Sequence, residues 1–242
     1  MADYLSGELK IGAASRRLYY RQNRSDEVVI KQTFIDHQYE LSRLKRGAEL
    51  IGYLQRRQSA GERPLIVDAG ANIGTSCVYF AATFANASVV AIEPDEQNFK
   101  LLAKNMEGMD VELVRAAIAS SAGRARISDP GEGPCGYRTE LIAADAAGMD
   151  TVSRVTINQI YESHPPPFFP FIAKIDIEGA ELDLFSANTD WVARTPLVIV
   201  ELHDWLLPKG RTSQSFLRCI SQLDRDFVYI GENVFSIAND LV

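Results

Sequence analysis

The chain has 242 residues, of which 46% are hydrophobic and 24% are charged, and its formal net charge at pH 7 is −7. This composition is ordinary for a soluble globular protein, and the length fits one α/β domain with additions. The negative charge argues against a general nucleic-acid-binding protein, and the sequence contains no run of 18 apolar residues that would predict a membrane span.

The cysteines and the first residues of the chain point to the cytoplasm. The three cysteines show no CxxC spacing, which predicts neither a disulfide framework nor a zinc site. The first ten residues, MADYLSGELK, lack the apolar stretch of a secretory signal, so we expect a cytoplasmic protein. These patterns predict no particular oligomeric state.

Residues 1–60 are predicted to form an accessory or cap region ahead of a main domain at 61–242. Strand-like segments at 9–13, 16–22 and 27–34 precede one helix in this region. The apolar residues that indicate this helix by their spacing are Leu41, Leu44, Ala48, Ile51 and Leu54.

From about residue 65 the chain alternates between short apolar runs and helical patterns. This alternation predicts a parallel sheet with helices on both faces. The predicted strands are 65–68, 88–92, 111–115, 171–176, 196–202, 226–230 and 233–237. The link between the last two, around Gly231 and Glu232, is so short that only an antiparallel hairpin can form there. The sheet is therefore expected to finish with an antiparallel strand.

Two segments are predicted to be irregular. Residues 129–150 are rich in Gly, Pro, Ala and Asp and are predicted to form a loop. The segment HPPPFFPF, 164–171, is predicted to contain neither regular helix nor central strand, because proline fixes φ and lacks a backbone donor. Such a segment beside a strand could shape a pocket or serve as a rigid connection.

The stretch LIVDAGANIGTSCVYF, residues 65–80, carries the strongest signal for a ligand. A buried strand ends at Asp68, and Gly70 and Gly74 follow before a helical pattern begins. Glycine permits positive φ and close backbone approach, and a helix N-terminus presents free N–H groups. The turn therefore predicts a ligand that brings an anionic or oxygen-rich group close to the backbone.

The details of this turn favour a nucleoside ligand over the dinucleotide NAD. Counted from Gly70, the dinucleotide fingerprint G-x-G-x-x-G meets Asn72 and Thr75 where its later glycines should stand, and no Walker A lysine follows. Glu93 closes the next apolar strand, where a carboxylate can accept both ribose hydroxyls, although it could also serve as a charge at a helix N-terminus. Ala117 belongs to a run of small residues that suits a flat ring.

Together these segments resemble the FkbM family of S-adenosylmethionine-dependent methyltransferases. The matching motifs are VDAGANIG with IEPD, then KIDIEGAELDLF, then VIVELH, and the resemblance runs from about residue 26 to about residue 237. It implies a Rossmann-like class I methyltransferase fold, with a seven-stranded, mostly parallel sheet whose last strand is antiparallel. The cofactor-binding residues that the resemblance implies are Asp68, Gly70, Asn72, Gly74, Glu93 and Ala117.

The resemblance leaves the acceptor open. Family members often have an aromatic residue, commonly tryptophan, in the loop that corresponds to residues 136–138, where this chain has tyrosine. Tyr39, Tyr137 and Arg138 could line an acceptor pocket or could pack as core and rim residues.

Methyl transfer to a hydroxyl needs a group that removes a proton, and two strand ends offer candidates. Asp176 and Glu178 lie two apart on an extended segment and so face the same way, as do Glu201 and His203. The two strands are neighbours in this fold, so the four candidate catalytic residues are expected to converge at the sheet edge that binds ligands. Lys174 points to the opposite face from its strand neighbours and could pair with an acid.

Three interpretations of this cluster stay open. Asp176 or His203 could be the general base. Asp176, Glu178 and His203 could hold a divalent cation such as Mg²⁺ that orients a diol. The acids could instead cap the helix, with Asp176 holding the ammonium of the cofactor and no side chain acting as base.

The sequence thus predicts an S-adenosylmethionine-dependent O-methyltransferase that acts on a small hydroxylated acceptor, a sugar or a natural product. An N-methyltransferase is the nearest alternative. An NAD(P)-linked oxidoreductase and a non-catalytic cofactor-binding module are the others, and the missing glycines and the retained acidic cluster argue against them.

Overall fold

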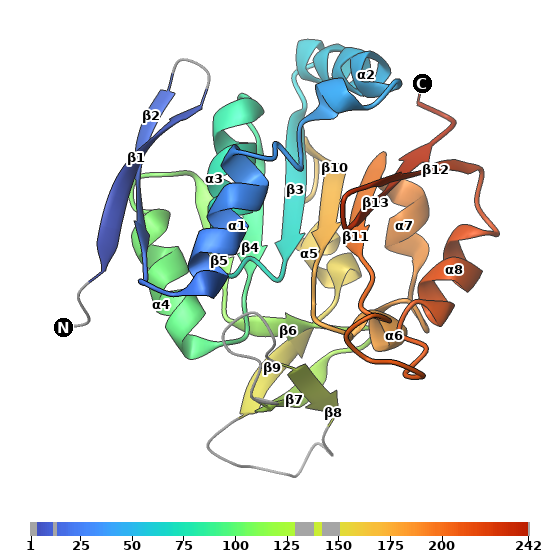
Figure 1. Cartoon of the computed structure of the whole chain (residues 1–242). Helices are drawn as coiled ribbons and strands as arrows, with labels where there is room; N and C mark the ends of the chain where they lie inside the picture. The colour runs from blue at the N-terminus through green and yellow to red at the C-terminus, as the bar shows by residue number, and fades with distance from the viewer. Residues whose placement is uncertain (1–3, 12–13, 129–137, 142–150, 242) are drawn as a thin grey trace.

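The computed structural model describes residues 4–11, 14–128, 138–141 and 151–241. A seven-stranded sheet forms the centre, and helices cover it on both sides. A smaller sheet lies beyond one end of the central strands (Figure 1). Within the described ranges, no helix has the length and apolar character that crossing a membrane requires.

The central sheet has the strand order β12-β13-β11-β10-β3-β4-β5. Its strands are β3 (Arg63–Ala69), β4 (Ser88–Ile92), β5 (Val111–Val114), β10 (Phe168–Ile175), β11 (Leu197–Glu201), β12 (Arg225–Ile230) and β13 (Asn233–Ala238). Strands β11, β10, β3, β4 and β5 pair in parallel. The predicted class, a mostly parallel α/β sheet of the Rossmann-like methyltransferase type, is confirmed, and all seven predicted strands are present.

The last strand of the sheet is antiparallel, as the short link after β12 predicted. β12 and β13 form a hairpin in which Ile230 pairs with Asn233, and Gly231 in the turn has a φ of +63°. β13 also pairs antiparallel with β11, so it lies between β11 and β12. The final strand is therefore an interior strand of the sheet.

The prediction that residues 164–171 contain no central strand is wrong, because β10 begins at Phe168. Pro170 pairs with Leu65 of β3, and the register shifts between Pro170 and Ile172. Pairing with β11 starts only at Ile172, so β10 has a strand neighbour on one side alone at the proline. A residue without an N–H group is tolerated where a strand has a free edge or a bulge.

The sheet separates two apolar cores because successive side chains of a strand face opposite sides. Ile66 belongs to one core, whereas Leu65 and Val67 belong to the other. The helices whose residues join the first core are α2 (Gly47–Ser59), α3 (Thr75–Thr83) and α4 (Glu96–Asn105). The helices whose residues join the second are α5 (Ile157–Ser163), α6 (Glu181–Leu184), α7 (Asp190–Arg194) and α8 (Gln214–Ile220).

The N-terminal region contains a hairpin and two α-helices. The hairpin pairs β1 (Leu5–Ile11) with β2 (Ala14–Tyr20). Residues 27–34, predicted to be a strand, belong instead to helix α1 (Arg24–Phe34), and η1 (Leu41–Arg43) is a short 3-10 helix.

Local capping explains why α1 is helical despite its β-branched residues. The side chain of Asn23 accepts a hydrogen bond from the N–H of Asp26 at 2.8 Å, and two acids occupy the first turn. Leu18 and Tyr39 of this region belong to the first apolar core, together with residues of the sheet. The proposed boundary near residue 60 therefore does not separate two cores among the described residues.

A second sheet, which sequence patterns did not predict, is inserted between β5 and β10. Its strand order is β6-β9-β7-β8, and its strands are β6 (Ala116–Ile118), β7 (Gly123–Ser128), β8 (Arg138–Leu141) and β9 (Thr151–Val155). Most of the predicted loop at 129–150 lies outside the described residues, including the predicted pocket residue Tyr137. The backbone of Arg138, for which a pocket position was one of two alternatives, begins β8, so the loop prediction is wrong at residues 138–141.

Candidate active site

The glycine turn between β3 and α3 is shaped by its close approach to the end of β10. Gly70 has a φ of +77°, and a Cβ atom placed on it would lie 1.7 Å from the backbone oxygen of Asp176. Gly74 precedes α3 with a φ of +91°, and Asn72 between them has a φ of +51°. The turn is thus built from positive-φ positions, two of which only glycine fits without strain.

Glu93 ties this turn to the end of the next strand. Its two carboxylate oxygens accept hydrogen bonds from the backbone N–H groups of Asn72 and Asp95, each at 2.9 Å. Burial raises the pKa of the Glu93 carboxyl to about 7, although these hydrogen bonds act in the opposite direction. The structure therefore brings two of the predicted cofactor-binding residues, Glu93 and Asn72, into direct contact.

Ala117 lies in strand β6 of the second sheet. It is buried and lines a cavity of about 190 Å³ together with Gly179 and Arg154. Its predicted contact with an adenine ring stays a prediction.

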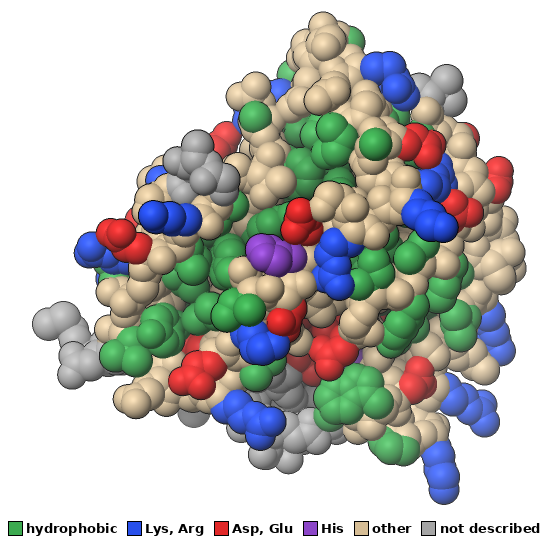
Figure 2. Space-filling model, turned by 45° about the horizontal axis from the view of Figure 1, so that its top comes forward, with side chains coloured by type: hydrophobic (Ala, Val, Ile, Leu, Met, Phe, Trp, Pro, Cys, Tyr) green, Lys and Arg blue, Asp and Glu red, His purple; other side chains and the backbone are tan. Residues whose placement is uncertain are grey.

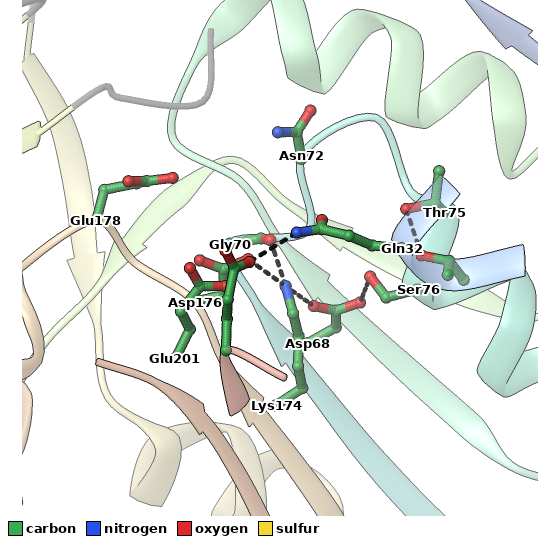
Figure 3. Close-up of polar contacts among 12 residues, drawn as sticks. Gln32, Asp68, Gly70, Asn72, Thr75, Ser76, Lys174, Asp176, Glu178 and Glu201 are labelled. Carbon is green, nitrogen blue, oxygen red and sulfur yellow. Dashed lines mark hydrogen bonds and ion pairs between the residues drawn. The ribbon is translucent and has the colours of Figure 1, made fainter. Parts of the chain in front are cut away.

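Lys174 is the centre of the polar contacts beneath the turn (Figure 3). Its Nζ donates a hydrogen bond to the backbone oxygen of Gly70 at 2.8 Å and lies 3.2 Å from Asp68 and 3.5 Å from Asp176. Burial lowers the pKa of this ammonium, but Asp68 and Asp176 outweigh it and hold the pKa above its ordinary value. The predicted pairing of Lys174 with an acid is confirmed.

Asp68 belongs to the support of the turn. Its side chain is fully buried, and its Oδ2 accepts a hydrogen bond from the hydroxyl of Ser76 at 2.5 Å and one from the thiol of Cys77 at 3.1 Å. Together with Lys174 it links the end of β3 to α3 and to the turn.

The four candidate catalytic residues converge as predicted, and His203 is their common neighbour. The Nε2 atom of His203 lies 3.5 Å from Glu178, 3.6 Å from Asp176 and 3.7 Å from Glu201. Its Nδ1 atom lies 2.9 Å from the buried carboxylate of Glu181, a residue that the sequence reasoning did not assign to the site. The sequence signal for Glu181 was its position three residues after Glu178 at the start of a helix, a spacing that lets the two side chains approach each other.

Burial and mutual repulsion set the charges of this cluster. For Glu178, burial and the nearby Asp176 raise the pKa to about 8, and for Glu201 the same causes raise it to about 9. Burial lowers the pKa of His203, but the hydrogen bond to Glu181 and the surrounding carboxylates raise it to about 10. Burial therefore favours the neutral forms of Glu178 and Glu201, and the surrounding carboxylates favour the protonated form of His203.

A cavity of about 430 Å³ opens beside this cluster. Figure 2 shows acidic side chains gathered in the lower part of one face, with hydrophobic side chains next to them. The residues that line the cavity are Val28, Val29, Gln32, Asn72, Asp176, Glu178, Glu201, Trp205, Leu206 and Glu232. We call it the inner cavity.

Helix α1 forms one wall of the inner cavity, which sequence patterns did not indicate because they misassigned this segment. Gln32 of α1 donates a hydrogen bond to Glu232 in the β12–β13 turn at 2.8 Å and so joins two walls of the cavity. The sequence left two positions open for Tyr39, in a pocket or in the core. The structure places it in the first apolar core, buried against Phe80.

The sheet order and the glycine turn, placed at the carboxyl ends of the parallel strands, define a nucleoside-binding α/β protein of the class I methyltransferase type. The model of the methyltransferase FkbM domain matches residues 68–229, so the chain belongs to the FkbM methyltransferase family. It is an S-adenosylmethionine-dependent methyltransferase. The oxidoreductase and the non-catalytic module are therefore set aside.

Two curated relatives are also methyltransferases. The chain is 29% identical over 174 residues to the hexuronic acid methyltransferase AglP of Haloferax volcanii, with 70% of each protein covered. It is 29% identical over 115 residues to the methyltransferase sdnD of Sordaria araneosa, and this match covers 46% of the chain and 38% of that protein.

Solved structures with a similar arrangement include monomeric WbdD and an O-methyltransferase from Bacillus cereus in complex with SAH. WbdD is 14% identical, with a TM-score of 0.46, and the match covers 81% of this chain and 41% of that one. The Bacillus cereus protein is 12% identical, with a TM-score of 0.41, and the match covers 79% and 81%.

Proposed function

We propose that this methyltransferase acts on a hydroxyl oxygen of a small polyhydroxylated acceptor, a sugar or a sugar-like natural product. The observation that carries the proposal is the inner cavity, where three carboxyl side chains, Asp176, Glu178 and Glu201, stand beside the glycine turn. Such groups hydrogen-bond hydroxyls in several directions, and the cavity lies at the sheet edge where doubly wound folds bind ligands.

The cofactor is proposed to lie along the carboxyl ends of β3 and β4. Its oxygen-rich end would meet the backbone between Gly70 and Gly74, and Glu93 would accept a hydrogen bond from its ribose. The Glu93 carboxyl already accepts two backbone N–H groups and a side-chain hydrogen bond from Asn98, which leaves about one of its four lone pairs for a ribose hydroxyl. Bound S-adenosylmethionine would supply an electrophilic methyl group on its sulfonium.

Asp176 is our candidate for the general base. It lines the inner cavity, and its side chain is 27% exposed, whereas the side chain of His203 is only 1% exposed. The raised pKa of about 10 keeps His203 protonated at neutral pH, so this ring cannot accept a further proton there. His203 would instead balance the negative charge of the carboxylates and hold them in place.

The lining of the inner cavity favours an uncharged acceptor. Four acidic side chains line it, and no lysine or arginine is found among its described lining residues. Even where Glu178 and Glu201 are protonated, this lining offers an anionic acceptor no lysine or arginine as a cationic partner to offset its desolvation. The acceptor proposed here is therefore neutral, in contrast to the hexuronic acid named for the relative from Haloferax volcanii.

The base assignment is tested by the variants Asp176→Asn and Glu201→Gln, assayed with S-adenosylmethionine and a neutral acceptor. If Asp176 removes the proton, Asp176→Asn lowers kcat by about 10²–10⁴-fold while Glu201→Gln mainly changes KM. Near-normal turnover of Asp176→Asn would contradict the base assignment.

A divalent cation at the same cluster is the second candidate, and one observation favours it. One donor atom each from Asp176, Glu178 and His203 can be chosen so that all lie within 4.8 Å of one another. Two carboxylates and an imidazole are a donor set that divalent cations such as Mn²⁺ or Mg²⁺ accept. A bound cation would orient a diol acceptor.

Titration calorimetry with MnCl₂ and MgCl₂, on wild type and on Glu178→Gln, tests the cation directly. Binding that is abolished in the variant, together with activity lost after chelation and restored by the metal, would support this candidate. Absence of binding and full activity in a chelator would leave Asp176 as the base without a metal.

A further inference from the structure

A smaller cavity adjoins the inner cavity and shares two residues with it. This outer cavity has a volume of about 270 Å³ and is lined by Leu202, Trp205, Tyr229 and Glu232. Trp205 and Glu232 line both cavities, so the outer cavity lies next to the inner one and to the carboxylate cluster.

Two aromatic side chains of the outer cavity are exposed. Trp205 is 65% exposed and Tyr229 is 62% exposed, whereas Trp191, the other tryptophan, is 1% exposed in the core. Large aromatic side chains left in water at the mouth of a polar cavity are the residues that most often carry binding energy. Each can cover the apolar face of a ring while a polar group hydrogen-bonds at the ring edge.

Trp205 lies close to His203 and therefore to the carboxylate cluster. Its ring lies 6.3 Å, centre to centre, from the ring of His203, and only one residue separates them in the chain. Glu232 offers the polar group of the outer cavity, and it is held toward the inner cavity by Gln32. The outer cavity is therefore held in a fixed position relative to the cluster that would meet the acceptor hydroxyl.

The size of the inner cavity leaves little room for a long acceptor. Its volume of about 430 Å³ must hold one end of the cofactor and the acceptor ring that receives the methyl group. This volume lies near the lower end of the range for small-molecule sites, about 300–1,000 Å³. The outer cavity offers room for a second unit of the acceptor beside Trp205 and Glu232.

We propose that the outer cavity is an acceptor subsite that binds a second, neutral sugar ring, stacked on Trp205 and Tyr229 with its hydroxyls directed to Glu232. This proposal rests on the proposed function, because it extends the same acceptor site. It makes the preferred substrate a glycoside of at least two rings instead of a free monosaccharide.

The fluorescence of exposed Trp205 reports directly whether a ligand binds in the outer cavity. Acrylamide quenches the fluorescence of exposed Trp205 but not that of buried Trp191, so a ring stacked on Trp205 protects it. Quenching is measured in the presence of S-adenosylhomocysteine with matched neutral probes: glucose and maltose, galactose and lactose, mannose and mannobiose. We expect at least one disaccharide to protect Trp205 at a concentration where its monosaccharide protects less.

Variants separate the subsite from the methyl transfer itself. With the probe pair that is methylated best, Trp205→Ala and Tyr229→Ala should lower the ratio of kcat/KM for disaccharide over monosaccharide by about tenfold. Leu217→Ala is the matched control, because Leu217 is an exposed apolar residue on α8 that lines neither cavity. This control should leave the ratio unchanged.

Two results would overturn the subsite: equal protection by both members of every pair, or no protection by any disaccharide. An unchanged ratio in both aromatic variants would do the same. These results differ from failure of the proposed function, in which a disaccharide protects Trp205 but no methyl group from S-adenosylmethionine reaches a hydroxyl of any acceptor.

Discussion

Replacement of Gly70 by alanine tests whether the close approach of the turn to β10 makes the cofactor site. Gly70 has a φ of +77°, and its added Cβ would lie 1.7 Å from the backbone oxygen of Asp176. Gly61 has a similar φ of +85°, but nothing lies within 4 Å of an added Cβ there. Gly61→Ala therefore has the same backbone strain without the clash.

The expected size of the effect follows from this geometry. Strain from a left-handed backbone is roughly 1–2 kcal/mol for a non-glycine residue, and it is common to both variants. Gly70→Ala must also move the end of β10, because atoms 1.7 Å apart have to separate to at least 3.0 Å. A displacement of about 1 Å in a reaction site can lower the rate about 10²-fold, which corresponds to about 2.7 kcal/mol.

The assay combines calorimetric binding of S-adenosylmethionine with thermal unfolding of both variants. We expect a lower unfolding temperature for Gly70→Ala than for Gly61→Ala, because only Gly70→Ala has the clash. We also expect a loss of affinity or of kcat/KM of about 100-fold for Gly70→Ala alone. Equal affinity in both variants would refute the reasoning, because the clash would then have no consequence for the site. Loss of binding in both would attribute the effect to backbone strain.

Two other changes probe the buried charges. Lys174→Met should lower the free energy of unfolding in chemical denaturation by about 3–5 kcal/mol, because Asp68 loses its buried cation. The double variant Lys174→Met with Asp68→Asn should recover much of this loss, because no unpaired buried charge remains. Burial raises the pKa of Glu93 to about 7 from an ordinary value near 4.5, so its contribution to the free energy of unfolding is fully present below pH 4.5 and is lost as pH rises through 7. Glu93→Gln should remove up to about 3 kcal/mol of this pH dependence between about pH 4 and 8, and identical pH profiles of the two proteins would contradict the assignment.

Much of the central sheet could be predicted because its strands are short apolar runs between turn residues, and β3, β4 and β11 are buried on both faces. The antiparallel pairing of β12 and β13 could be predicted from the shortness of their link alone. Residues 27–34 were misassigned because Val28, Val29 and Ile30 suggest a strand, whereas the cap at Asn23 and the packing of α1 against α3 decide for a helix. The strand at Pro170 was missed because no local pattern reveals that β11 pairs only beyond it.

The acidic cluster was predictable because residues two apart after neighbouring strands must meet at one edge of the sheet. The charges within it were not, because they depend on burial: His203 looks like a base in the sequence and becomes an imidazolium beside Glu181. The wall formed by α1 could not be predicted either, since Gln32 and Glu232 are 200 residues apart.

The interior position of β13 has a consequence for the order in which the protein assembles. Strand β12 has β13 as its neighbour, and β11 reaches β12 only through β13. During synthesis, residues 225–230 must therefore wait outside the sheet until 233–238 emerge and insert. Tyr229 lies on β12 and Glu232 lies in the β12–β13 turn, so the outer cavity is complete only once β13 has inserted beside β11.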